Sequence, residues 1–258
     1  MKHANRKVIL LVIKICAHSA SVFLSEEGSA VKIENELVSR AAMRISRTVL
    51  VVNSSPNLET SHSRALSHHF TNALEARYPR QYTLLHRDLA INPVPHIQHD
   101  TLEVIAKNTT TTPQARALAM LSDTLIKEVE DSHAIIISTP MHNFTTPASL
   151  KAYFDLIMRA GKTFKYTSEG PQGLLFDRPI LLISCSGGYY HRTNSDFLTP
   201  YVSRVFNFMG MTNLKSIAAE GMAMDDKKEL SLAHARGNLE QSIEWFHTSE
   251  NTRAHSKN

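Results

Sequence analysis

The sequence predicts a doubly wound α/β fold, in which a parallel β-sheet carries helices on both faces. Short apolar runs rich in β-branched residues are the first observation: residues 134–137 read Ala-Ile-Ile-Ile, which suits a strand buried on both faces. Such runs alternate along the chain with segments whose apolar residues recur at helical spacing. Five strands alternating with helices imply a parallel sheet with right-handed crossovers.

The composition excludes several classes of protein. The chain has 258 residues, of which 42% are hydrophobic and 20% charged, as in ordinary globular proteins. Its net charge of +4 is spread out, without the basic stripe of a nucleic-acid-binding protein. No apolar stretch reaches the ~18 residues of a transmembrane helix, so no membrane partner is expected. Cys16 and Cys185 make no disulfide framework and fit a reducing, cytoplasmic compartment.

We expect one domain at residues 48–247, because neither an internal repeat nor a linker interrupts it. Residues 248–258 are predicted to be a disordered tail. Residues 1–47 are expected to be an N-terminal extension, either disordered or created by a misassigned start. A signal peptide, whose apolar core Lys14 would interrupt, and a native appendage are the alternatives. We favour a true start at Met43, which opens a short polar lead before the first strand.

The domain begins with a β-branched strand at residues 48–53, followed by a polar loop at 54–60. Ser61 or Ser63 is expected to cap the next helix, and Pro79 to end it.

A second strand at residues 82–89 leads into a long irregular connection at 90–112, which contains two prolines and is predicted to be a surface excursion. Pro113 suits the first turn of the following helix, whose apolar positions continue to Val129.

The third strand begins at Ala134, and Pro140 should end its pairing because proline has no N–H to donate. Another helix is expected between Pro147 and Gly161, and a hairpin at residues 163–173. The last elements are a strand at 180–184, a helix at 197–209, a strand at 214–219 and a helix at 225–246.

Three loops should meet at the carboxyl edge of the sheet, where open α/β sheets bind ligands: residues 54–63, 141–144 and 185–188. The first is rich in hydroxyls and opens a helix, so its N–H groups with Ser61 and Ser63 suit a phosphate. It lacks the G-x-G-x-x-G fingerprint of a dinucleotide site.

The other two loops suit the edges of a flat ring. The 141–144 loop offers two apolar and two polar side chains, and glycines in the 185–188 loop let backbone N–H groups approach closely. One phosphate site beside such loops favours a mononucleotide with a planar polar ring, and FMN fits better than NAD. Each loop alone has a plainer interpretation as a cap, a turn or a core plug. The ligand interpretation is favoured because all three follow strands of one sheet.

Other chemistry is less well supported. His68, His69, His96 and His99 lack the spacing of metal ligands, so no metal is expected. Cys185 is expected to be a structural or ligand-edge cysteine rather than a reactive thiol, because no His–acid pair can be assigned to it.

Several motifs occur together: V-L-V-V-N-S-S with a downstream S-H-S, then P-M-H-N-F, L-K-A-Y-F-D, R-A-G-K-T-F-K-Y-T, G-P-Q-G-L and S-G-G. They resemble the bacterial FMN-dependent NADH-azoreductases, which belong to the flavodoxin-like NAD(P)H:quinone oxidoreductases. The resemblance covers about residues 48–247 and is most specific at residues 140–174. It implies a flavodoxin-like fold with strand order 2-1-3-4-5, one FMN per subunit, NADH as electron donor, and a homodimer with two shared active sites.

The resemblance also implies the residues of the site. The ribityl phosphate of FMN would be bound by Ser55, Ser61, His62 and Ser63. The isoalloxazine would be lined by Met141, His142, Asn143 and Phe144, and its pyrimidine side by Cys185, Ser186, Gly187 and Gly188. Tyr166, and Phe208 from the partner subunit, would lie at the substrate face. No side chain is expected as a catalytic acid or base, because the flavin carries the chemistry.

By the same resemblance, the protein is expected to reduce quinones by two electrons and to cleave aromatic azo compounds, with a ping-pong hydride mechanism. The alternatives are a general FMN reductase or nitroreductase-like enzyme, and a flavin-binding electron carrier without turnover. Two positions depart from the family pattern. His142 stands where Tyr is common, and C-S-G-G replaces S-R-G-G, which removes an Arg beside the flavin.

Overall fold

The computed structural model describes residues 46–107 and 111–250. The expectations for the N-terminal extension and for the tail therefore fall almost wholly outside the described residues. The elements described below belong to one unit that begins at Arg47.

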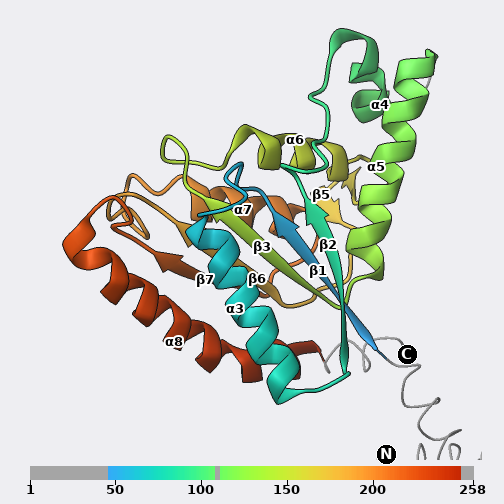
Figure 1. Cartoon of the computed structure of the whole chain (residues 1–258). Coiled ribbons are helices and arrows are strands. Elements are labelled where there is room, and N and C mark those ends of the chain that lie inside the picture. Colours follow the sequence, from blue (N-terminus) through green and yellow to red (C-terminus); the bar gives the residue numbers. More distant parts are fainter. Residues whose placement is uncertain (1–45, 108–110, 251–258) are drawn as a thin grey trace, which may run out of the picture. The chain divides into compact units, whose positions relative to one another are not determined.

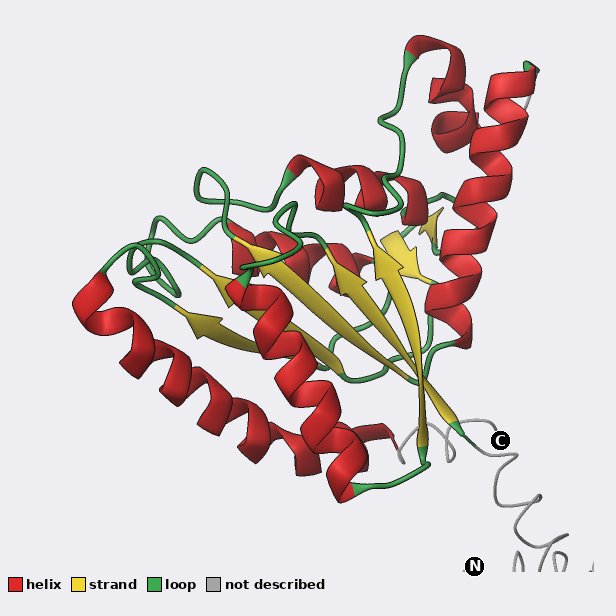
Figure 2. Cartoon of the chain, viewed as in Figure 1, coloured by secondary structure: helices red, strands yellow, loops and turns green. Residues whose placement is uncertain are grey.

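A five-stranded parallel sheet forms the centre of this unit (Figures 1 and 2). Its order is β2-β1-β3-β6-β7, which confirms the predicted order of the five parallel strands. The strands are β1 (Arg47–Asn53), β2 (Tyr82–Asp88), β3 (Ala134–Pro140), β6 (Ile180–Cys185) and β7 (Leu214–Ala219). Residues 180–185 of the fourth strand are all buried, as expected for a strand covered on both faces.

Helices cover both faces of the sheet and each face has its own apolar core (Figure 1). The helices are α3 (His62–Arg77), α5 (Pro113–Asp131), α6 (Ala148–Ile157), α7 (Leu198–Phe208) and α8 (Asp225–Glu250). Alternate strand residues such as Val51 and Ile136 pack with α3 and α8, and their neighbours, such as Val52 and Ile137, pack with α5, α6 and α7.

The predicted hairpin is present and is docked on the end of α7. Strands β4 (Phe164–Thr167) and β5 (Gly170–Gly173) pair in antiparallel fashion. A Cβ at Gly173 would lie 2.2 Å from the backbone nitrogen of Gly210, so the two backbones meet where no side chain fits.

The connection at residues 90–112 is more regular than the sequence suggested. It contains a short 3₁₀-helix, η1 (His99–Thr101), and the helix α4 (Leu102–Lys107). Val94 and Val104 are buried in the same core as α5, and this burial ties the segment to the domain.

Several predicted boundaries shift by a few residues; α6, for example, ends at Ile157 rather than near Gly161. Two of the shifts have a clear cause. β3 includes Pro140, paired in register with Cys185. Proline is tolerated here because an N–H at position 140 would point toward β1, and the pairing of β1 with β3 has already ended at Ser138. α8 continues past residue 246 to Glu250, because His247 stacks on Tyr78 with ring centroids 3.8 Å apart.

Candidate functional site

The loops that follow β1, β3 and β6 meet at the carboxyl edge of the sheet. The Ser54 N–H donates to the carbonyl oxygen of Ser138 (3.0 Å), and the Met141 N–H donates to that of Cys185 (2.7 Å). The structure therefore brings the three predicted loops together on neighbouring strands, in the crevice position where this architecture binds ligands.

The serine-rich turn opens α3. Ser61 is the N-cap, and its hydroxyl accepts the Arg64 N–H at 3.4 Å. The hydroxyls of Ser61 and Ser63 lie 3.2 Å apart, and the first N–H groups of the helix, including that of His62, have no intrahelical acceptor. Hydroxyls and free N–H groups at a helix N-terminus are suited to an anion.

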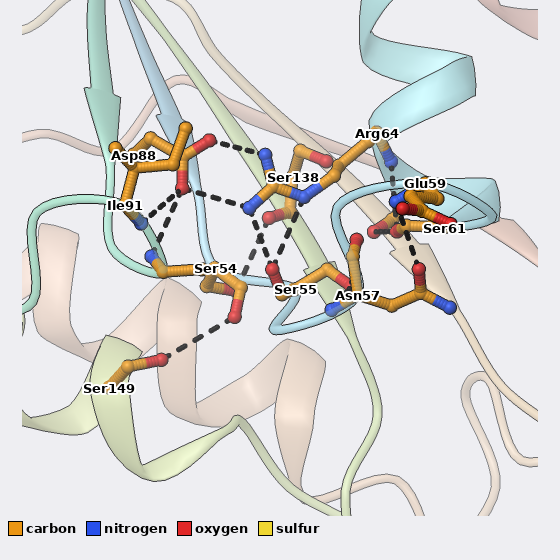
Figure 3. A network of polar contacts seen from close by, with 12 residues as sticks. Ser54, Ser55, Asn57, Glu59, Ser61, Arg64, Asp88, Ile91, Ser138 and Ser149 are labelled. Carbon is orange, nitrogen blue, oxygen red and sulfur yellow. Dashed lines mark hydrogen bonds and ion pairs between the residues drawn. The ribbon is translucent and has the colours of Figure 1, made fainter.

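Ser55 lies on the same turn and is held by a polar network with Arg64 and Asp88 (Figure 3). Its carbonyl oxygen accepts two N–H groups of the Arg64 guanidinium, from Nε at 3.2 Å and Nη2 at 2.7 Å. Arg64 also forms an ion pair with Asp88, at the end of β2. The turn continues with Asn57, whose side-chain oxygen accepts the Glu59 and Thr60 N–H groups.

Neither Arg64 nor Asp88 was among the site residues predicted from the sequence. The sequence does place an Arg in the first turn of the predicted helix and an Asp at the end of the second strand. Because the first two strands are neighbours in the sheet, these two positions could have been expected to lie close together. Arg64 lowers the pKa of Asp88 by its hydrogen bonds, so this carboxyl is ionised at neutral pH.

The loop after β3 contains a strained two-residue turn. His142 and Thr145 exchange backbone hydrogen bonds of 2.9 and 3.1 Å. Between them, Asn143 (φ +49°) and Phe144 (φ +70°) both adopt the left-handed region. Asn tolerates this conformation, whereas Phe rarely adopts it. Strain of this kind clusters at functional sites, and both side chains are exposed here.

The loop after β6 presents backbone rather than the cysteine side chain. Cys185 packs with the apolar core under α3 and α8, and this burial raises the pKa of its thiol to about 12. The Ser186 hydroxyl donates to the carbonyl oxygen of Gly188 at 2.8 Å. A Cβ at Gly188 would lie 2.8 Å from the end of the Tyr190 side chain, so a larger residue there would displace that ring.

Tyr190 and Glu220 complete this edge, and the sequence analysis missed both. The Tyr190 ring packs edge-on against Phe144, with centroids 5.3 Å apart. One carboxylate oxygen of Glu220 accepts the N–H groups of Tyr190 (2.5 Å) and His191 (2.7 Å). Glu220, at the end of β7, thus orients the chain that follows the glycines.

Tyr166 and Phe208 lie together, but apart from the three loops. Both rings contact Phe164, with centroids 5.5 and 4.7 Å away. Phe208 ends α7, whereas Phe197, before the start of that helix, donates its N–H to the carbonyl oxygen of Phe144. The two ends of α7 are about 16 Å apart at 1.5 Å per residue. Phe208 therefore lies about 16 Å along α7 from the end that contacts the 141–144 loop, and Tyr166 lies near Phe208 through their shared contact with Phe164.

A depression of about 550 Å³ adjoins the strained turn. Its polar walls include His142, Asn143 and Lys151, and the Tyr201 ring lies beside them. Within the described ranges, no three His, Cys, Asp or Glu side chains gather as metal ligands would. No helix of residues 46–107 or 111–250 is long and apolar enough to cross a membrane.

Comparison with known proteins gives consistent matches. A family model described as flavodoxin-like fold matches residues 47–243. An FMN-dependent NADH:quinone oxidoreductase of Alcanivorax borkumensis is 38% identical over 193 residues, covering 74% of this chain and 97% of its own. One from Idiomarina loihiensis is 39% identical over 182 residues, covering 69% of this chain and 90% of its own.

A solved structure of similar fold is that of an FMN-dependent NADH-azoreductase from Bacillus anthracis in complex with FMN. It has a TM-score of 0.70 and 28% identity, and the match covers 77% of this chain and 98% of that one.

Proposed function

The chain belongs to the flavodoxin-like fold family, and from this premise we propose that it is an FMN-dependent enzyme that uses NADH to reduce quinones and to cleave aromatic azo compounds. The observation that supports this most strongly is the meeting of an anion-binding turn, a strained turn and a glycine loop at one sheet edge. The match to whole relatives, not to a fragment of them, supports the same function.

The residues at this edge have the right chemistry for FMN. The Ser61 and Ser63 hydroxyls and the N-terminus of α3 suit its phosphate. Nearby, Asn53 Oδ1 and Ser138 Oγ are buried without a hydrogen-bond partner among the described residues. They lie at the same register on β1 and β3, so this edge retains hydrogen-bonding capacity for a polar ligand.

Each predicted site residue then has a role. Ser55, Ser61, His62 and Ser63 hold the ribityl phosphate. The turn from Met141 to Phe144 lines one edge of the ring. Cys185 to Gly188 offers backbone groups to its pyrimidine side, with the Cys185 side chain turned into the core.

Bound FMN would supply the two-electron exchange of a ping-pong cycle, taking a hydride from NADH and returning it to the acceptor. The protein positions the rings, excludes water and sets the local charge. Ser186 stands where the S-R-G-G pattern of the family that the sequence resembles has Arg, so less positive charge would face the ring than in that pattern. No acid or base is assigned among the side chains.

The active site is proposed to be shared between two subunits. Tyr166 is 73% exposed, and Phe208 is far from the loops of its own subunit. In a homodimer, the partner's copy of this aromatic cluster would cover the substrate face. The compartment is proposed to be the cytoplasm.

The test is to purify the protein, record its visible spectrum before and after adding FMN, and measure NADH oxidation with benzoquinone. A flavin spectrum with sustained turnover is expected. Absence of flavin bands after FMN is added would exclude the proposal. Flavin binding without sustained turnover would identify an electron carrier instead, and turnover only with free FMN as acceptor would identify a general FMN reductase.

A further inference from the structure

We propose that Arg64 and Asp88 are a positioning pair: they fix the shape of the phosphate-binding turn, and Arg64 does not itself supply charge to the phosphate. This inference rests on the proposed function, because it concerns the turn that would hold the FMN phosphate. A cation in the first turn of a phosphate-binding helix would ordinarily be taken as a direct phosphate ligand. The contacts of Arg64 argue against that role.

Four of the five N–H groups of the Arg64 guanidinium already have acceptors in Asp88 and Ser55 (Figure 3). Nη2 donates to Asp88 Oδ1 at 2.8 Å, and Nη1 pairs with Oδ2 of the same carboxylate. Nε and Nη2 donate to the Ser55 carbonyl oxygen. Both side chains are mostly buried, with 16% and 15% exposed. The fork therefore joins β2 to the turn after β1, and little of it reaches the surface.

The Asp88 carboxylate is itself held in place by further hydrogen bonds. Besides Arg64, its Oδ1 accepts the N–H groups of Ala90 at 3.0 Å and Ile91 at 3.2 Å. The carboxylate is thus fixed by the chain that follows β2. Through Arg64, the Asp88 carboxylate also fixes the carbonyl oxygen of Ser55.

The pair also leaves the turn nearly neutral. The carboxylate cancels the guanidinium charge at close range, so the phosphate would be bound by hydroxyls and N–H groups rather than by a cation. Free hydrogen-bonding capacity remains at the hydroxyls of Ser61 and Ser63.

Positioning and direct charge predict opposite effects for one substitution. Asp88→Asn removes the countercharge, so Arg64 would attract the phosphate more strongly if it acted by charge. If the pair acts by positioning, the same substitution loosens Ser55 and weakens phosphate binding. Arg64→Lys separates the two roles in another way, since it keeps the charge but loses the planar fork.

The experiment compares the dissociation constants of FMN and riboflavin for the apoprotein, measured by flavin fluorescence. Riboflavin lacks the phosphate, so the ratio of the two constants isolates the contribution of the turn. In the unmodified protein, FMN is expected to bind about 100-fold more tightly, as two or three charge-assisted hydrogen bonds would provide. Asp88→Asn and Arg64→Lys are each expected to weaken FMN about tenfold and riboflavin less than about threefold.

Arg87 and Glu128 provide matched controls. They form the same kind of pair, with 19% and 13% of the side chains exposed, and Nε of Arg87 lies 3.1 Å from Oε2 of Glu128. This pair joins β2 to α5 rather than to the turn. Arg87→Lys and Glu128→Gln are expected to lower stability without changing the FMN-to-riboflavin ratio.

Each outcome decides the question. The positioning role is supported if the preference for FMN over riboflavin falls in Arg64→Lys and Asp88→Asn but is unchanged in the two controls. If Asp88→Asn does not fold, the result for Arg64→Lys decides. A ratio unchanged in both variants, or tighter FMN binding in Asp88→Asn, overturns the inference and leaves the proposed function intact. An unmodified protein that binds FMN no better than riboflavin contradicts the phosphate site itself.

Discussion

Replacing Phe144 by alanine and by glycine tests whether the turn at residues 142–145 stores strain. Phe144 has φ +70° in a two-residue turn whose second central position normally favours glycine. Its side chain is 46% exposed and packs against the Tyr190 ring. Both substitutions remove the same ring, and with it the same buried surface area. The difference between them therefore reports the backbone alone.

The magnitudes favour glycine by a small margin. At an ordinary position, glycine is about 0.5–1 kcal/mol less stable than alanine because its unfolded chain is more flexible. In the left-handed region, alanine carries a penalty of about 1–2 kcal/mol that glycine lacks. The Phe144→Gly variant should therefore be more stable than Phe144→Ala by about 0.5 kcal/mol, a reversal of the usual order.

The assay is urea denaturation of the apoprotein variants, with FMN affinity measured in parallel. Both variants should bind FMN more weakly, because they lack the ring that is proposed to line the site. Arg80 is the matched control, since it is exposed at φ +60° in a turn outside the candidate site. Arg80→Gly should likewise be more stable than Arg80→Ala, without any change in FMN affinity. Greater stability of Phe144→Ala than of Phe144→Gly by about 0.5 kcal/mol or more would refute the strain argument.

Three further predictions concern single side chains. Burial raises the pKa of the Cys185 thiol to about 12, so this thiol should resist alkylation in the native protein at pH 8. The Cys185→Ala variant should keep its quinone turnover. Rapid labelling of the thiol, or loss of turnover in the variant, would contradict this. Arg64 lowers the pKa of Asp88, so the stability that this carboxylate adds is complete above its unfolded pKa, about 4, and is lost as the pH falls through the lower folded value. The gap in unfolding free energy between the unmodified protein and Asp88→Asn should therefore narrow below about pH 4, and a constant gap down to pH 2 would be inconsistent with it. The Tyr153 hydroxyl is buried without a hydrogen-bond partner among the described residues, so Tyr153→Phe should raise the free energy of unfolding in urea titrations by up to about 1 kcal/mol. A decrease of that size would show that the hydroxyl does have a hydrogen-bond partner.

The sheet was predictable because burial on two faces leaves a plain signal. The apolar run at residues 134–137 suited a buried central strand, and alternation with helical segments then indicated the topology. The short helices at residues 99–107 were not predictable, because their stability comes from packing of Val104 rather than from a long periodic pattern. The end of α8 was misjudged for the same reason, since the stacking of His247 on Tyr78 is a tertiary contact.

The loops of the candidate site were located by topology alone, because parallel strands place their carboxyl ends at one edge. What the sequence could not provide was the contacts between loops. Arg64 and Asp88 are 24 residues apart, and Tyr190 and Glu220 are 30 apart, so neither pair has a local pattern. The left-handed Phe144 was also unpredictable, since its conformation is imposed by the hydrogen bonds between His142 and Thr145.

The most direct test of the proposed chemistry is to load the purified protein with FMN, add NADH without oxygen, and then add benzoquinone. Visible flavin absorbance should be lost on adding NADH and restored by one equivalent of the quinone per bound flavin. Steady-state turnover should give the parallel double-reciprocal lines of a ping-pong cycle. A protein that takes up no FMN, or whose bound flavin NADH does not reduce, would contradict the central claim.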